Sequence, residues 1–239
     1  MEVHNHAHHG GAKNWKSYIW EFLMLFLAVF CGFLAEWQLE HKIENDREKE
    51  YIRSMVEDIN ADIEQIDRLT KDLDIRISRT DSLLVELSST YIYKNSSNAY
   101  QLWLKAQGFQ DFIQNDRTIQ QLKNSGGLRI IRKKLVSDKI MEYDQAVRML
   151  SVSQEMGNTY AANSLNLFTQ TFDFIKLDKN SYTSQPIPLT AKGKELLNEV
   201  YGNRRFWKTA LVRLQNRMKG LREKGQEAVG VIKKEYRIK

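Results

Sequence analysis

Residues 21–36, EFLMLFLAVFCGFLAE, decide the fold of this chain. The strictly apolar part covers residues 22–35 and is shorter than the roughly 20 residues that a helix needs to cross hydrocarbon. Aromatic residues extend it on both sides, and a helix over residues 15–37 would be about 33 Å long at 1.5 Å per residue. Tryptophan and tyrosine rings prefer the two headgroup layers of a bilayer. We therefore predict a transmembrane helix over residues 15–37, with four membrane-interface residues: Trp15, Tyr18, Trp20 and Trp37.

Three other interpretations of this run make demands on neighbouring residues. A cleaved signal peptide needs small residues at its cleavage site, and residues 33–36, FLAE, contain no A-x-A pattern. Lipid attachment at Cys31 needs a small residue before the cysteine, where the chain has Phe30. A buried helix of a soluble protein stays open as an alternative, because apolar runs of about 10 to 14 residues are typical of such helices.

The composition indicates one helical body and excludes several kinds of chemistry. About 200 of the 239 residues follow the apolar run, and 2 prolines and 12 glycines leave few helix breaks. All five histidines lie at or before His41, and Cys31 is the single cysteine. The residues after His41 therefore lack the side chains of nitrogen–sulfur zinc sites, histidine proton transfer and cysteine catalysis. The phosphate-loop, HExxH and GxGxxG patterns are absent as well, so we expect a protein that is not an enzyme and uses no cofactor.

Apolar residues recur in alternating steps of three and four along three stretches of the body, a spacing that keeps one seam facing a partner helix. The three seams are Ile52, Val56, Ile59, Ile63, Ile66, Thr70, Leu73, Ile77, Thr80, Leu84 and Leu87; then Val136, Ile140, Tyr143, Val147 and Leu150; then Leu197, Val200, Arg204, Trp207, Leu211, Leu214, Met218, Leu221, Gly225, Ala228 and Ile232. The predicted fold class is all-α: one N-terminal transmembrane helix followed by an elongated antiparallel helical bundle with coiled-coil-like long helices.

The predicted organisation has three parts. A disordered His-rich tail covers residues 1–14, the transmembrane helix covers 15–37, and the bundle domain covers 38–239. Long helices are expected over about 38–89, 134–174 and 191–236. Shorter helices are expected over about 98–125, at residues 100–106 and 112–123, with a stop at 124–127. Ser137 and Thr190 are the predicted caps of the second and third long helices.

Charge is divided unevenly along the body. Residues 42–90 carry 13 acidic and 8 basic side chains, whereas residues 191–239 carry 14 basic and 5 acidic ones. The two segments should therefore attract each other. A basic chain also suggests nucleic-acid binding, but the positive segment already has an internal partner of opposite sign, so we expect no nucleic acid.

Three groups of residues are candidate sites, each with a simpler explanation. The histidines of the tail offer imidazoles to a transition metal, although a flexible tail supplies no rigid geometry. Small residues on one face of the predicted span could form a dimer seam or share that face by chance. Basic residues could contact an anion or lipid headgroups, or form a solvated surface. The groups are His4, His6, His8 and His9 for metal; Ala28, Cys31, Gly32 and Ala35 for the transmembrane dimer face; and Arg129, Arg132, Lys133, Lys134, Lys233 and Lys234 for anion or lipid contact.

Three stretches resemble a family of bacterial single-pass membrane proteins with a helical soluble domain of unknown function. They are EFLMLFLAVFCGFLAE at 21–36, REKEYIRSMVEDI at 47–59 and LKNSGGLRIIRKKLVSDKIMEY at 122–143. The resemblance implies a single-pass protein of the bacterial inner membrane and transfers no active-site residue. The His-rich opening departs from it.

Two functions are compatible with this sequence. The preferred hypothesis is a non-enzymatic, membrane-anchored interaction or scaffold module of the bacterial cell envelope, with the bilayer, an unknown protein and a transmembrane homodimer as partners. The alternative is a receptor-like sensor that binds a small ligand within the bundle. A pocket lined by Tyr143, Arg148, Tyr160 and Trp207 would favour the sensor, and a closed core with an exposed apolar stripe would favour the module. Basic residues flank the span on both sides, and the side of the membrane that holds the body stays open.

Overall fold

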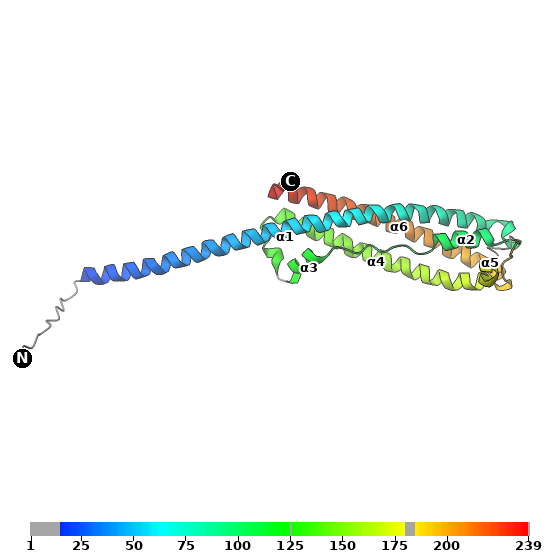
Figure 1. Ribbon diagram of the computed structural model, residues 1–239, viewed down its shortest axis with the longest axis horizontal. Helices are drawn as coiled ribbons and strands as arrows, with labels where there is room; N and C mark the ends of the chain where they lie inside the picture. The colour runs from blue at the N-terminus through cyan, green and yellow to red at the C-terminus, as the bar shows by residue number, and fades with distance from the viewer. Residues whose placement is uncertain (1–14, 125, 180–184, 239) are drawn as a thin grey trace, which may run out of the picture. The chain divides into compact units, whose positions relative to one another are not determined.

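The computed structural model describes residues 15–124, 126–179 and 185–238, and every regular element in these ranges is helical (Figure 1). The prediction of an all-α fold is confirmed. The chain divides into two units, residues 1–50 and residues 51–239, and the first helix contributes to both. In chain order the elements are α1 (Trp15–Ser88), the 3₁₀ turn η1 (Thr90–Tyr93), α2 (Ser97–Ala106), α3 (Arg117–Asn124), the 3₁₀ turn η2 (Gly127–Arg129), α4 (Lys134–Thr171), α5 (Phe174–Lys179) and α6 (Ala191–Tyr236).

The described part of the first unit is the beginning of α1, residues 15–50, and its apolar side chains are exposed. Near its N-terminus α1 contains an 18-residue window apolar enough to cross a membrane, and none of this window is buried in protein. Phe22, Phe26 and Phe30 stack at successive turns, with centroids 6.3 Å and 5.9 Å apart. This segment therefore has the length and composition of a membrane-spanning helix.

The second unit is a bundle of three long helices: α1 from Tyr51 onward, α4 and α6 (Figure 1). Helix α6 runs antiparallel to the other two. Its ion pairs with α1 show this direction, because Arg222 contacts Asp67 at 2.7 Å and Lys208 contacts Asp81 at 2.5 Å. These pairs are partly exposed and contribute little to stability, but they match the opposite charges of the two helices.

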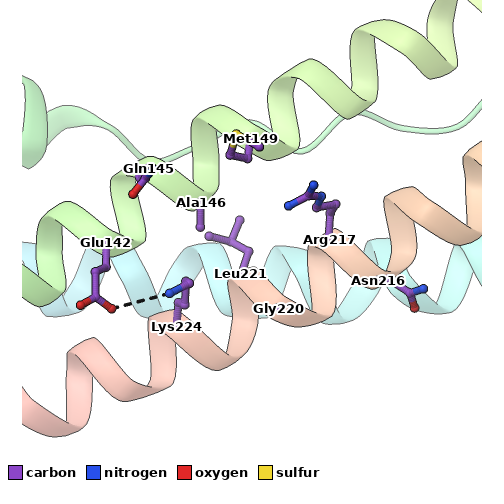
Figure 2. Close-up of a pocket in the computed structure, with 9 residues that line it drawn as sticks. All are labelled: Glu142, Gln145, Ala146, Met149, Asn216, Arg217, Gly220, Leu221 and Lys224. Carbon is purple, nitrogen blue, oxygen red and sulfur yellow. Dashed lines mark ion pairs between the residues drawn. The ribbon is translucent and has the colours of Figure 1, made fainter.

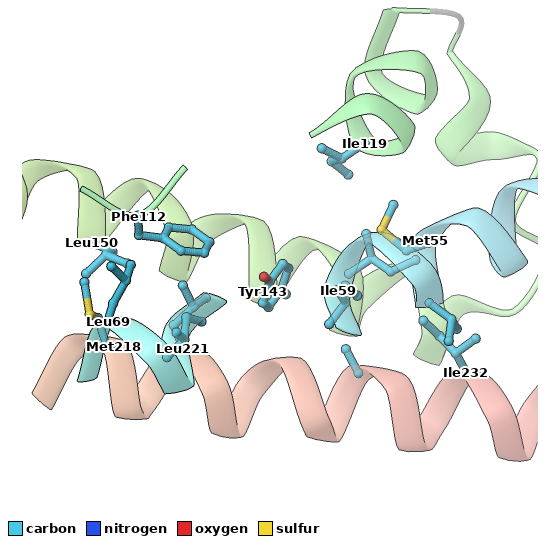
Figure 3. Close-up of a cluster of buried hydrophobic side chains, with 14 of the residues drawn as sticks. Met55, Ile59, Leu69, Phe112, Ile119, Tyr143, Leu150, Met218, Leu221 and Ile232 are labelled. Carbon is cyan, nitrogen blue, oxygen red and sulfur yellow. The ribbon is translucent and has the colours of Figure 1, made fainter. Parts of the chain in front are cut away.

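The apolar seams of the sequence form the core of this bundle. In α6, ten of the eleven seam positions are buried, and in α1, eight of eleven. Side chains from α1, α4 and α6 meet in one cluster with Phe112 and Ile119 from the connection between α2 and α4 (Figure 3). A second cluster contains the stacked rings of Trp103 and Phe168, 4.6 Å apart. Complete burial of one such side chain stabilises the fold by about 1.5–3 kcal/mol.

The connection between α1 and α4 returns the chain to the other end of the bundle, so α1 and α4 run in the same direction (Figure 1). Residues 107–116 form no helix, and the helix predicted at 112–123 is wrong over its first five residues. Two glutamine amides occupy backbone groups there. Gln65 accepts from the amide of Ile113 at 2.8 Å and donates to its carbonyl at 3.0 Å, and Gln154 does the same for Phe112 at 3.3 Å and 3.3 Å. These side chains provide the partners that a helix would otherwise supply.

One of the two predicted helix caps is present. The side chain of Thr190 caps α6 by accepting from the amide of Gly193 at 2.8 Å. The prediction for Ser137 is wrong, because α4 already begins at Lys134 and its N-cap, Lys133, makes no side-chain cap bond. Helix α3 ends at Asn124, at the predicted stop.

Two glycines of α6 should respond in opposite ways to a methyl group. A Cβ on Gly193 would overlap the carbonyl oxygen of Thr171 and lie 2.8 Å from its Cα, whereas a Cβ on Gly230 meets nothing within 4 Å. We expect Gly193→Ala to lower the free energy of unfolding by about 1–2 kcal/mol through overpacking. Gly230→Ala should raise it by about 0.5–1 kcal/mol through helix propensity. Denaturant unfolding of the detergent-solubilised full chain, followed by circular dichroism, measures both, and equal shifts of one sign would contradict this packing.

Candidate functional site

The surface between α4 and α6 contains a groove with a volume of about 370 Å³ (Figure 2). Ala146 and Gly220 have little or no side chain, and the buried Leu221 lies between the two helices. Small residues at the facing positions therefore leave the space. The lining residues are Glu142, Gln145, Ala146 and Met149 from α4, and Asn216, Arg217, Gly220, Leu221 and Lys224 from α6.

Charges are paired at one end of this groove. Lys139 contacts Glu227 at 2.8 Å and Glu142 at 3.1 Å, and Lys224 contacts Glu142 at 3.6 Å. Hydrogen bonds to Glu227 and Glu142 raise the pKa of Lys139. The hydrogen bond from Lys139 lowers the pKa of Glu142. This end therefore carries carboxylates and ammonium groups that already have partners.

The middle of the groove is basic and apolar. Arg217 is exposed and makes no hydrogen bond or ion pair with any residue in the described ranges. Arg213 donates from Nη1 to the sulfur of Met156 at 3.8 Å. A second hollow shares Asn216 and Arg217 with the first and adds Arg213.

Exposed apolar side chains continue along the same two helices. Met149, Val152 and Met156 follow one another at helical spacing on α4 and are 46%, 59% and 41% exposed. Phe206 on α6 is 62% exposed and borders a third hollow between the helices. We call this surface the α4–α6 face and define it by Gln145, Met149, Val152, Met156, Phe206, Arg213 and Arg217.

The predicted membrane residues all lie in the first part of α1. Their side chains point outward from the helix, and each of them is exposed. The same holds for the predicted dimer face, whose cysteine carries a free thiol. The residues are Trp15, Tyr18, Trp20 and Trp37 at the interfaces and Ala28, Cys31, Gly32 and Ala35 on the stripe.

The predicted basic group gathers at one end of the bundle. Lys133 pairs with the carboxylate of Glu235 at 3.2 Å and lies 5.2 Å from the ring centroid of Tyr236. This contact brings residues 129–134 beside the end of α6, which carries Lys233 and Lys234. Lys133 is therefore occupied by α6, and anion or lipid contact stays a prediction for this group.

The predicted metal ligands His4, His6, His8 and His9 lie outside the described residues. Among residues 15–124, 126–179 and 185–238, no three histidine, cysteine or acidic side chains are grouped so that they could hold a metal ion.

None of the three hollows described above is lined by the four residues that would have favoured a sensor, Tyr143, Arg148, Tyr160 and Trp207. Tyr143 and Trp207 are buried in the core, where Tyr143 donates to Asp62 at 2.7 Å and Trp207 to the carbonyl of Ala106 at 3.4 Å. Arg148 is exposed and pairs with Asp144. The interior is therefore filled at these positions.

Two buried carboxylates hold the connection against α1, and sequence reasoning assigned them no role. Asp58 accepts from the amide and the hydroxyl of Thr118 at 3.1 Å and 2.5 Å, at the start of α3. Asp62 accepts from the amide and the side chain of Asn115, both at 2.8 Å, and from Tyr143. Burial raises the pKa of Asp62, although these hydrogen bonds act in the opposite direction. Asp58 and Asp62 are four residues apart and lie beside the apolar seam, and this spacing is the signal that could have identified them.

Arg204 occupies a seam position inside the bundle and is 1% exposed. Its Nε and Nη2 donate to the side-chain oxygen of Asn203 at 3.3 Å and 3.0 Å, while Nη1 has no partner in the described part of the chain. The guanidinium lies 5.4 Å from the ring centroids of both Phe168 and Trp207. Burial lowers the pKa of Arg204 to about 9. The seam pattern located this residue without indicating that it would be buried as a cation.

Comparison of the chain with protein-family models, curated proteins and solved structures finds no match. The α4–α6 face combines three kinds of chemical group. Its guanidinium groups can bind carboxylates, its amides can donate and accept, and its apolar side chains can be buried by a partner.

Proposed function

We propose that this protein is a non-enzymatic, membrane-anchored interaction module. The first part of α1 anchors the chain in a lipid bilayer, and residues 51–239 present a protein-binding surface. The observation that carries the proposal is the exposed apolar stripe of the α4–α6 face beside a filled core.

Three exposed apolar side chains at helical spacing on one face of α4, Met149, Val152 and Met156, support a protein partner. Single exposed apolar residues are ordinary on protein surfaces, whereas contiguous patches mark interaction sites. Met149 and Met156 suit such a role, because unbranched thioether side chains adapt to the shape of a partner. A sensor has less support, since Tyr143 and Trp207 pack into the core.

The anchor is supported by the exposure of the apolar window in α1, of which no part is buried in protein. Each Å² of apolar surface left in water costs about 25 cal/mol, so lipid is the favourable surrounding for these side chains. The resemblance at residues 21–36, 47–59 and 122–143 supports a single-pass protein of the bacterial inner membrane. The small residues Ala28, Cys31, Gly32 and Ala35 are where a transmembrane homodimer would form.

Two lysines in the apolar run should release the chain from membranes. Lysine at the centre of a span strongly disfavours insertion, so we expect Leu27→Lys with Phe30→Lys to move most of the protein into the supernatant of an alkaline carbonate wash. The wild type should stay in the pellet. Val85→Lys is the matched control, because Val85 is an exposed apolar residue of the same helix outside the run. Wild-type protein in the supernatant would contradict the proposal that α1 anchors the chain in a membrane.

The binding half of the proposal is tested separately on intact membranes. An amine-reactive cross-linker should produce adducts that contain this chain and a second, different protein. Adducts that are absent, or that contain copies of this chain alone, contradict a partner-binding function.

A further inference from the structure

We propose that the α4–α6 face binds an acidic amphipathic helix of a partner protein. This inference rests on the interaction function proposed above and adds the location of the site and the chemistry of the partner.

The shape of the surface suits a helix. Antiparallel α4 and α6 form the two walls, and two hollows lie between them, while a third, lined by α6 alone, adjoins the first at Asn216 and Arg217. From Glu142 to Met156, α4 rises by about 21 Å, which is the length of a four-turn helix. Met149, Val152 and Met156 lie at i, i+3 and i+7 on one face of α4 and give this wall an apolar surface, against which an amphipathic helix can lay its own apolar face.

The neighbouring groove between α1 and α4 is already occupied by the chain itself. Residues 107–116 lie there, held by Gln65 and Gln154, with the ring of Phe112 buried. An added Cβ at Gly157 of α4 would lie 2.7 Å from the ring of Phe109, which shows how closely this segment approaches the helix. The α4–α6 face offers a comparable cleft with exposed apolar side chains.

Unpaired positive charge on this surface indicates that the partner contributes negatively charged residues. On the side of α6 that faces α1, Arg222 pairs with Asp67 and Lys208 with Asp81. At one end of the groove Lys224 pairs with Glu142. On the α4–α6 face, Arg213 contacts a thioether and Arg217 has no partner in the described ranges. Guanidinium groups form strong, bidentate bonds with carboxylates. An Asp- or Glu-bearing helix therefore complements this surface.

The same charges disfavour a second copy of this chain. A two-fold interface places the same patch on both sides, so the basic surface with Arg213 and Arg217 would lie against the equally basic surface of the other protomer. Like charges brought together across an interface are repelled, and the occupant is therefore a different protein.

Site-specific photo-cross-linking of the full chain in its own membranes tests this inference. Val152 is replaced by the photoreactive residue benzoylphenylalanine, and a control carries it at Val85, which is exposed on α1. After irradiation, mass spectrometry identifies the attached segment. We expect a second protein at position 152 and none at position 85, attached through a helix whose apolar residues are flanked by Asp and Glu.

Charge reversal provides the second readout. Arg213→Glu with Arg217→Glu should reduce the yield of this adduct at least about tenfold, whereas Arg213→Lys with Arg217→Lys should retain most of it. Both arginines are exposed, so the thermal unfolding of these variants should match that of the wild type and exclude misfolding as the cause.

Four results would overturn the inference: no adduct at position 152, an adduct with a second copy of this chain, an attached segment that is not acidic and helical, or a yield insensitive to charge reversal. A second protein attached at position 85 but not at 152 would contradict the location of the binding site on the α4–α6 face and would still agree with the interaction function. Absence of any second protein with both this probe and the amine cross-linker overturns both.

Discussion

Replacement of Asp62 by alanine is expected to lower the free energy of unfolding by about 2–4 kcal/mol. Asp62 is 1% exposed and is the acceptor for Asn115 and Tyr143. Burial and the neighbouring carboxylate raise the pKa of Tyr143, so its hydroxyl keeps its proton and needs an acceptor. Without Asp62, a buried donor is left unsatisfied. Denaturant unfolding of the full chain in detergent measures the loss.

Two companion variants identify the cause of this loss. Removal of both partners of a buried hydrogen bond is less harmful than removal of one, so Tyr143→Phe should restore part of the stability in the Asp62→Ala background. Glu64→Ala, at an exposed position of the same helix, should change the free energy by less than about 0.5 kcal/mol. Equal losses in Asp62→Ala and Glu64→Ala would contradict the role of this carboxylate.

Asp62 also predicts a pH dependence whose sign follows from its raised pKa. Between its ordinary pKa and the raised value, the folded protein binds the proton more tightly than the unfolded chain does. The contribution of Asp62 to stability is therefore greatest at low pH and falls as the pH rises through the raised pKa. Asparagine does not titrate, so Asp62→Asn should gain stability relative to the wild type as the pH rises from the ordinary pKa of an aspartate through the raised value. An unchanged difference over this range would contradict the raised pKa.

Arg204→Met, in contrast to Asp62→Ala, is expected to stabilise the protein, by about 3 kcal/mol. Burial lowers the pKa of Arg204 from 12.5 to about 9, a difference that corresponds to about 5 kcal/mol. Loss of the contacts with the rings of Phe168 and Trp207 offsets about 2 kcal/mol of this. Methionine can fill the same space and contact both rings through sulfur.

The loss of folding stability caused by burial of the Arg204 guanidinium should be independent of pH near neutrality. A base with a lowered folded-state pKa loses stability as the pH falls from its ordinary pKa to the lowered one, and below that range the loss is complete. Unfolding experiments from about pH 6 to pH 8 should therefore show a constant gain for Arg204→Met. Arg205→Met, at the adjacent exposed position, is the control and should stay within about 0.5 kcal/mol of the wild type. A destabilised Arg204→Met variant would show that this cation is satisfied in the core.

The fold class could be predicted from the sequence because the buried face of a bundle helix must carry apolar side chains, and these recur at the helical spacing. Spacing of three and four residues placed Trp207, Met218 and Ile232 on one face of a helix, and all three are buried. The connection was harder to predict, because its conformation depends on distant partners. Nothing local to residues 112–116 indicates that Gln65 and Gln154, far away in the sequence, bind their backbone groups.

The α4–α6 face could not be predicted for a similar physical reason. Met149 and Val152 lie off the buried seam, and their helical spacing alone does not say whether they pack inside the bundle or face outward. Their meaning depends on Arg213 and Arg217, which belong to a different helix about 60 residues away in the sequence and become neighbours through helix packing. The apolar run in α1 was easier to identify, since a span depends on consecutive residues.

The packing of α6 against α1 has a consequence for biosynthesis. Helix α6 contacts α1 across about 150 intervening residues, as in Arg222 with Asp67, and contacts this distant in sequence form slowly during folding. Until α6 has left the ribosome, the apolar side chains of α1 and α4 that pack against it are exposed to aggregation. A premature stop before Ala191 would leave the surfaces that α6 covers exposed, so the integrity of this 46-residue helix governs whether the newly made chain reaches its native state.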